Sequence, residues 1–253
     1  MTKFIFILLT LYRYSDIIFS QELCFTKEIV MLLYHGSEKI IKKPEYGLGK
    51  KNNDYGRGFY CTESIELAKE WACAGGSDGY GNKYELDTAG LKILDLNSDE
   101  YNILNWLALL AKNRTYWQSG SISYEANEYL KSNFLPETDG FDIIKGYRAD
   151  DSYFSFAQDF VANAISLKKL SQAMKLGKLG EQIVLVSKRA FANIHFTGYE
   201  IAKASLYYAK KTERDLAARR EYRDVRDKAN SINEIFMLDI MREGIKNGDS
   251  RLR

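Results

Sequence analysis

The sequence predicts an α+β fold built around one domain, and three observations lead to this prediction. The chain has 253 residues, a length that suits one domain with appended segments. Hydrophobic residues make up 45% of it and charged residues 28%, which is ordinary for a globular protein and argues against disorder, collagen or a coiled-coil rod. Short apolar runs typical of strands are interspersed with longer segments of helical character.

The predicted elements follow one another along the whole chain, starting near Met31. A polar loop with Pro44, Gly47 and Gly49 is expected over residues 38–53, and glycines over residues 74–81 are expected to break the chain sharply. Strands are predicted at residues 31–34, at the end of 54–61, and at 84–87, 91–96, 141–144, 182–186 and 193–196. Helices are predicted at residues 64–72, 101–112, 124–132, 152–164 and 167–176.

Residues 1–30 are expected to form an N-terminal extension. An apolar run over residues 4–11 is too short to span a bilayer, and no small-x-small cleavage site follows it. Three explanations stay open: a dispensable extension or a translation start at Met31, an export or anchor signal, and an extra packed element. No other segment approaches 18 uninterrupted apolar residues, so no stable membrane partner is expected.

Residues 198–253 are predicted to be a helical C-terminal extension rich in charge. Nine basic and five acidic residues lie between Lys203 and Lys228, and their signs alternate. This pattern favours a solvated helical face with ion pairs, and a surface for nucleic acid or a partner protein is the alternative.

Charge and cysteine content restrict the function classes. Lys and Arg total 36 and Asp and Glu 34, so the net charge of +2 provides no global field for gathering nucleic acid, although a local patch is compatible with it. Three cysteines without a CxxC pair and two histidines are too few for a zinc site, and no metal is expected. The sparse, odd cysteine set favours a reducing compartment, which predicts a cytoplasmic location.

Three separated motifs require a common explanation. They are Tyr-His-Gly-Ser at residues 34–37, Tyr-Gly-Arg-Gly-Phe-Tyr at residues 55–60 with Trp71 beyond it, and Gly-Glu-Gln-Ile-Val-Leu at residues 180–185. Each motif alone is weak, because a His-Gly-Ser or a Gly-x-Gly occurs in many tight bends. Together, in this order and at the ends of predicted strands, they are much more specific.

This combination resembles the ADP-ribosyltransferase superfamily of the diphtheria-toxin and poly(ADP-ribose) polymerase type, in which a His, a Tyr and a Glu or Gln mark the site. It looks closest to a bacterial, toxin-like branch of uncharacterised transferases, which shares the stretches at residues 54–62 and 146–154. The resemblance covers residues 31–196. It implies a split, strongly bent mixed sheet around an NAD cleft within a catalytic domain of residues 31–197, with a helical insertion near 100–133 and a helical tail.

The resemblance also implies roles for individual residues. Tyr60 and Trp71 would stack on the flat nicotinamide ring of NAD. The backbone of Gly36 would hold the carboxamide, where the absence of a Cβ allows close approach. His35 would hydrogen-bond a ribose hydroxyl, and Ser37 would add a polar contact.

The third motif position has two candidates, Glu181 and Gln182. A carboxylate or amide near the ribose 2′-hydroxyl would orient the sugar and stabilise the positive charge that develops as nicotinamide leaves. Glu181 follows the register of the polymerases, and Gln182 follows that of the bacterial branch. Successive residues of a strand point to opposite faces, so only one of the two can act, and both are retained.

The segment Tyr147-Arg-Ala-Asp-Asp151 is the other dense group of polar residues. Arg148 is expected to meet the pyrophosphate of NAD, and Asp150 or Asp151 to bind ribose or to receive a proton from the acceptor. The alternative is a plain helix entry, where acidic residues are favourable. Arg57 is expected to be solvated near the cleft, and structural roles are expected for His195, Cys61 and Cys73.

The resulting prediction is a mono-ADP-ribosyltransferase that transfers a pentosyl group from NAD to a macromolecular acceptor, protein or nucleic acid, and releases nicotinamide. Toxin-like relatives often occur with a neutralising partner, so a toxin–antitoxin pair with an antitoxin protein is a secondary expectation. Ala68 departs from the polymerase pattern, which has a hydroxyl residue three positions before the second stacking aromatic. An RNA 2′-phosphotransferase, an NAD hydrolase and a non-catalytic binding module stay open as alternatives.

Overall fold

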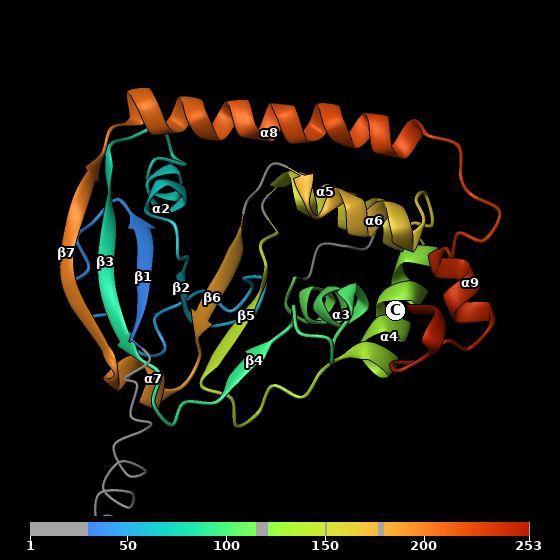
Figure 1. Ribbon diagram of the computed structural model, residues 1–253, viewed down its shortest axis with the longest axis horizontal. Helices are drawn as coiled ribbons and strands as arrows, with labels where there is room; N and C mark the ends of the chain where they lie inside the picture. The colour runs from blue at the N-terminus through green and yellow to red at the C-terminus, as the bar shows by residue number, and fades with distance from the viewer. Residues whose placement is uncertain (1–29, 115–120, 150, 177–179, 253) are drawn as a thin grey trace, which may run out of the picture.

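The computed structural model describes residues 30–114, 121–149, 151–176 and 180–252, and the predicted extension before residue 30 lies outside them. The fold is α+β, with two open β-sheets and helices packed around them (Figure 1). The first sheet is antiparallel and has the order β1-β3-β7, formed by Val30–Ser37, Gly79–Asp87 and Ile194–Ala202. The second has the order β2-β6-β5-β4, formed by Phe59–Cys61, Glu181–Leu185, Ile143–Tyr147 and Ile93–Asp95.

The second sheet is mixed. β6 pairs antiparallel with both β2 and β5, whereas β4 pairs parallel with β5. Its side chains alternate between two hydrophobic clusters, as the pleat of a strand requires. Ile183 and Leu185 face the cluster shared with the first sheet, and Val184 faces the larger cluster under the helices. Both faces are therefore buried, which explains the continuous apolar run in β6.

The two sheets are joined where β1 approaches β2. Tyr34 donates its amide to the carbonyl of Thr62 at 2.8 Å, and Thr62 donates its amide back to the carbonyl of Tyr34 at 2.9 Å. This single bridge places the end of β1, which carries residues 35–37, beside β2.

Helix α2, Ile65–Ala72, packs on the first sheet at very short range. A Cβ on Gly36 would lie 1.9 Å from the carbonyl oxygen of Ala68, and one on Gly79 would lie 2.7 Å from that of Ala72. Glycines are therefore required at this contact. The sequence predicts a sharp break over all of residues 74–81, but the chain turns only at residues 74–78. Gly79 and Gly81 already belong to β3, where they allow α2 to pack closely.

The predicted helical insertion is present as α3, Ile103–Asn113, and α4, Ser121–Phe134. Asn102 caps α3 by accepting a hydrogen bond from the Leu104 amide at 2.9 Å, and Asn105 accepts one from the Asn102 amide at 2.8 Å. Further along the chain, α5 spans Asp151–Val161, α6 spans Leu167–Ala173 and the short α7 spans Lys188–Ala192. None of the helices within the described ranges is both long enough and apolar enough to cross a membrane.

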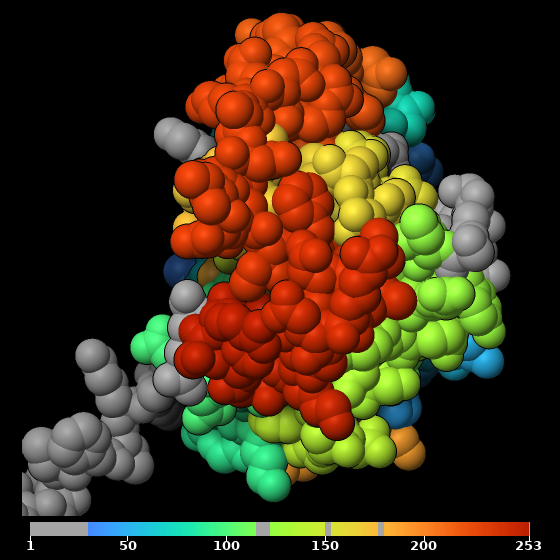
Figure 2. All heavy atoms as spheres, turned by 90° about the vertical axis from the view of Figure 1, so that its right-hand side faces the viewer, coloured from blue at the N-terminus to red at the C-terminus, as the bar shows by residue number. Residues whose placement is uncertain are grey.

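The C-terminal part begins later than the expected boundary at residue 198, because β7 continues to Ala202. Residues 198–202 pair with β3 and belong to the first sheet. The helical extension starts with α8, Ala204–Asp227, and continues with α9, Met237–Arg242, and a 3-10 turn, Ser250–Leu252. Figure 2 shows the segment after α8, in red, lying over α4 and the α5–α6 pair.

Helix α8 connects the two halves of the molecule (Figure 1). Near its start, Lys210 pairs with Glu66 of α2 at 3.0 Å, and Arg214 pairs with Glu70. Near its end, Tyr222 donates to Asp159 of α5 at 2.6 Å and stacks on Phe156. Only Tyr207, Ala218 and Tyr222 of this helix are buried, so most of its charged surface faces solvent, as the alternating signs predict.

The close contact between α2 and the first sheet can be tested with Gly79→Ala. We expect this variant to lose about 1–3 kcal/mol of unfolding free energy, because the added methyl group meets backbone and Ala72 atoms at 2.7–2.9 Å and forces them apart. Gly75→Ala is the matched control, since its methyl group would meet only the end of the Glu38 side chain at 3.3 Å. Equal stability of the two variants in urea unfolding would show that this contact is looser than described.

Candidate active site

A large cleft of about 1270 Å³ opens where the two sheets meet. Elements far apart in the sequence contribute to its lining: the end of β1, strand β2, helix α2, strand β6 and the segment after β5. Among its lining residues are His35, Gly36, Ser37, Tyr60, Trp71, Arg148 and Gln182. The three motifs singled out in the sequence are thus in one place.

His35 is fixed by a contact across the junction of the sheets. Its Nδ1 lies 2.7 Å from the carbonyl oxygen of Tyr60, and its ring stacks on Phe59 with centroids 4.4 Å apart. A carbonyl oxygen only accepts hydrogen bonds, so Nδ1 carries the proton and Nε2 of the neutral ring is an acceptor. Burial lowers the pKa of His35 below its ordinary value of 6.5, although the bond to Tyr60 opposes this shift. The neutral ring, which can accept a hydroxyl proton, is therefore favoured at pH 7.

Gly36 and Ser37 continue the rim of the cleft beyond His35. Gly36 has no room for a side chain because α2 lies directly against it. Ser37 Oγ accepts a hydrogen bond from the Lys39 amide at 3.2 Å, which leaves its own proton for another acceptor.

The hydroxyl of Tyr60 is already engaged by the glycine-containing loop before β2. It donates to the carbonyl of Gly56 at 2.6 Å and accepts from the amide of Tyr55 at 3.0 Å. Burial, the largest influence, raises the pKa of Tyr60 far above its ordinary value of 10, so the phenol stays protonated. What Tyr60 offers to a ligand is its aromatic ring.

Trp71 lies across the cleft on α2, and the guanidinium of Arg148 stands 4.1 Å from the centre of its ring. Such a cation–π contact favours an indole over other aromatic rings. Trp71 Nε1 is buried and has no hydrogen-bond partner among the described residues. An unpartnered buried donor is costly, which indicates a place where a ligand or water completes the contacts.

The structure separates the two candidates for the third motif position. Gln182 lines the cleft, is only 7% exposed, and its Oε1 has no hydrogen-bond partner in the part of the chain that is described. Glu181 points to the other face of β6, where it forms an ion pair with Lys145 at 2.7 Å and accepts from Asn97 at 2.6 Å. Of the two, Gln182 has the position that can meet a ligand in the cleft.

Asp54 and Arg114 are site residues to which sequence reasoning assigned no role. Asp54 is buried and accepts from Arg114 Nε at 2.8 Å and from the Ala149 amide at 3.0 Å. Asn113 also donates to the Asp54 carbonyl at 3.1 Å. These bonds hold the glycine loop, the end of α3 and the segment after β5 together. Asp54 opens the recognised Asp-Tyr-Gly stretch, but nothing near Arg114 in the sequence marks it.

Some of the remaining residues singled out in the sequence line the cleft, and others lie elsewhere. Arg148 lines the cleft, Asp151 is the first residue of α5, and Asp150 lies outside the described residues. His195 is exposed on β7 and is not part of the cleft lining. The other two predicted structural residues are buried: Cys73 donates to the Ala202 carbonyl, and burial raises the pKa of the Cys61 thiol well above its ordinary value.

No group of three or more His, Cys, Asp or Glu side chains suited to a metal ion occurs among the described residues.

Comparison with known proteins identifies a family without naming an activity. Residues 31–196 match the family described as proteins of unknown function, DUF3990, and because the match covers most of the chain, the protein belongs to this family. No curated protein and no solved structure matches the chain.

The protonation state of His35 provides a test of the site geometry. We expect its imidazole to be the neutral Nδ1–H tautomer at pH 6.5, with a titration midpoint below that value, because burial favours the uncharged ring. Since the folded pKa is depressed, the stabilising contribution of neutral His35 is complete above pH 6.5 and is lost as the pH falls through the folded pKa.

Nitrogen-detected histidine NMR measures both the tautomer and the midpoint. The chain has two histidines, so the His195→Gln variant assigns both resonances. A His35 ring that is charged at pH 6.5, or protonated on Nε2 alone, would contradict the contact with Tyr60.

Proposed function

We propose that this protein transfers one ADP-ribose group from NAD to a macromolecular acceptor and releases nicotinamide. The observation that carries this proposal is the convergence of His35, Tyr60 and Gln182, from three separated motifs, on one cleft. These motifs are the ones that resemble the ADP-ribosyltransferases. The joined pair of sheets with its helical insertion agrees with the split sheet that the resemblance implies.

The residues of the cleft fit the parts of NAD. The rings of Tyr60 and Trp71 provide aromatic surfaces for the nicotinamide, and the Gly36 backbone on the cleft rim would hydrogen-bond the carboxamide. Trp71 Nε1 is a buried donor and Gln182 Oε1 a buried acceptor, and neither has a hydrogen-bond partner among the described residues. Polar atoms of NAD would satisfy both. Arg148, next to Trp71, supplies a cation for the pyrophosphate.

In the proposed reaction these residues bind the ribose of NAD and stabilise the positive charge that develops on it. Nε2 of neutral His35 would accept a hydrogen bond from a ribose hydroxyl and hold the sugar in place. Gln182 Oε1 would accept from the 2′-hydroxyl and place its negative dipole end near C1′, where positive charge develops as nicotinamide leaves. An amide does this without a full charge, which favours a single transfer over chain elongation.

Ala68 stands where the polymerases have a hydroxyl residue, and its methyl group offers no polar atom to the carboxamide. It is fully buried, and its carbonyl oxygen lies against Gly36 at the tightest point between α2 and β1. Ser37, which has a free hydroxyl proton on the cleft rim, is the side chain that would hold the carboxamide instead.

The comparison of Gln182→Ala with Glu181→Gln tests the proposal at its most specific point. We expect Gln182→Ala to reduce nicotinamide release by about 10²–10³-fold, a loss typical of removing one transition-state contact. Glu181→Gln is the matched control on the opposite face of β6, and we expect it to retain activity. His35→Ala should lose activity as Gln182→Ala does, with the fold intact by circular dichroism.

The measurement is chromatographic quantification of nicotinamide after incubation with NAD and a whole-cell lysate. Absence of nicotinamide with the wild-type protein would remove the transferase proposal. Loss of activity in Glu181→Gln together with full activity in Gln182→Ala would show that the reaction takes place on the other face of β6.

A further inference from the structure

The cleft carries more positive charge than NAD requires. Its lining contains seven basic residues and three acidic ones, and the pair between Asp54 and Arg114 leaves six against two, a local excess of +4. The whole chain has a net charge of only +2, so this excess is concentrated here. The two phosphate groups of NAD need fewer cations than this. The basic lining residues are Lys39, Lys42, Lys43, Lys50, Arg114, Arg148 and Lys211.

Four of the seven basic lining residues come from the loop between β1 and β2. Lys39, Lys42, Lys43 and Lys50 are exposed, and none of them forms an ion pair with a residue in the described ranges. Lysines held in internal ion pairs would contribute little to binding a polyanion. These four remain available to ligand phosphates.

Two further hollows adjoin the cleft, with which they form a row of pockets that share lining residues. A narrow one of about 110 Å³ shares Gly58 with the cleft, and it shares Tyr46 and Arg57 with a depression of about 550 Å³ beyond it. We call the cleft, the narrow hollow and the depression together the basic groove. An extended ligand in this groove would pass from the end of β1 around the loop to the start of α7.

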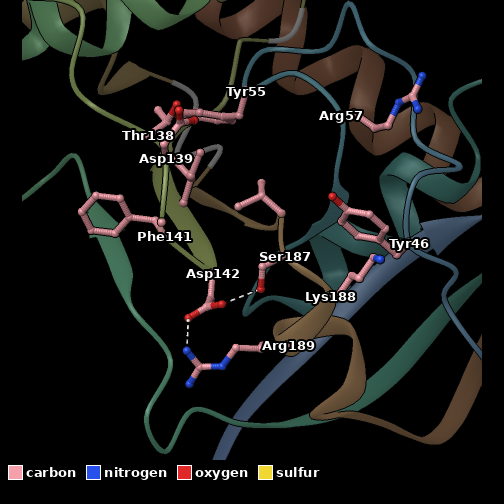
Figure 3. A pocket seen from close by; sticks show the side chains of 13 residues that line it. Tyr46, Tyr55, Arg57, Thr138, Asp139, Phe141, Asp142, Ser187, Lys188 and Arg189 are labelled. Carbon is pink, nitrogen blue, oxygen red and sulfur yellow. Dashed lines mark hydrogen bonds and ion pairs between the residues drawn. The ribbon is translucent and has the colours of Figure 1, made fainter.

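The depression adds cations and an aromatic ring, as Figure 3 shows. The Lys188 ammonium lies 5.9 Å from the centre of the Tyr46 ring, and Arg57 is exposed on the neighbouring loop. Asp142 is already occupied, since Ser187 donates to it at 2.5 Å and Arg189 lies 3.7 Å from it. Asp139 is the second acidic residue of this lining, so once Arg189 and Asp142 are paired, Arg57 and Lys188 stand against one carboxylate.

Apolar surface lies among these charges. Tyr46 is 53% exposed and Leu48 is 76% exposed, and both belong to the lysine-rich loop. Alternating cations and exposed flat or apolar side chains are the arrangement on which unpaired bases stack while the phosphates are neutralised. An acidic protein would use the cations but would have no need of the exposed ring.

We propose, on the basis of the proposed function, that the basic groove binds a single-stranded nucleic acid and that this strand is the acceptor of ADP-ribose. A single strand fits better than a duplex, because the acceptor atom has to enter the cleft and reach the atoms beside Gln182. The bond between C1′ and the nicotinamide nitrogen breaks, and nicotinamide leaves with the bonding electrons as a neutral molecule. An oxygen or nitrogen of the strand forms the new bond to C1′ and gives its proton to solvent.

The binding half of this proposal is tested by fluorescence anisotropy with labelled single-stranded RNA, single-stranded DNA and duplex DNA of mixed sequence. The triple variant Lys42→Gln/Lys43→Gln/Lys50→Gln removes groove cations. Its matched control is Lys175→Gln/Lys228→Gln/Lys246→Gln, three exposed lysines that do not line the groove. We expect the groove variant to bind single strands at least about tenfold more weakly. Its slope of log K against log salt should fall by about 2, at ~0.7 per lost phosphate contact.

The acceptor half is tested with NAD labelled in its adenylate part and the same oligonucleotides. Label that migrates with the single strand and is removed by nuclease supports the proposal. Label found on protein only, or equal binding by the groove variant and its control, overturns it. Salt-sensitive binding that depends on the groove lysines, without any nicotinamide release, would refute the proposed transferase and leave the nucleic-acid groove standing.

Discussion

The whole arrangement depends on one short contact, the bridge between Tyr34 and Thr62. Its two backbone hydrogen bonds are the point at which β1 and β2 are tied edge to edge. Directly beside it, His35 donates to the carbonyl of Tyr60, so two residues 25 positions apart in sequence become neighbours. Without this junction the first sheet would carry a histidine and the second a tyrosine, but there would be no shared cleft. The backbone register, more than any side chain, sets the distance between the two motifs.

A second constraint holds the far wall of the cleft. Trp71 sits on α2, which the glycines of the first sheet allow to approach to backbone contact. Helix α8 clamps α2 from outside through Arg214 and Glu70, and it contacts α5, which follows Arg148, through Tyr222 and Asp159. The long charged helix thus contacts α2, which carries the indole, and α5, which follows the arginine along the chain. This gives a structural reason for a helix that buries so few of its own side chains.

Many of the helices and strands could be predicted from the sequence because local hydrophobic patterns determine them. Apolar periodicity predicted α3, and a β-branched run predicted β6. The site motifs were recognisable because their spacing at strand ends is specific. Secondary structure was predicted less well where contacts between distant parts of the chain determine it. Gly79 and Gly81 suggest a turn in isolation, and only the proximity of α2 explains why they lie within β3.

Within the site, too, local sequence patterns could not show what depends on tertiary contacts. The alternation of strand residues showed that Glu181 and Gln182 exclude each other, but the choice depended on which face of β6 meets the cleft, a tertiary fact. Glu181 is the residue that chemistry alone favours, yet it is paired with Lys145 on the other face. Arg114 shows the limit more strongly, because its partner Asp54 lies 60 residues earlier and no periodicity connects them.

The proposed function requires that NAD binds where the two sheets meet. A crystal structure of the protein with NAD, or with a non-hydrolysable analogue, tests it most directly. We expect the nicotinamide ring to lie against Tyr60 and Trp71, with ribose hydroxyls within hydrogen-bond distance of His35 Nε2 and Gln182 Oε1. A dinucleotide bound elsewhere, or a cleft that stays empty at saturating NAD, would contradict it.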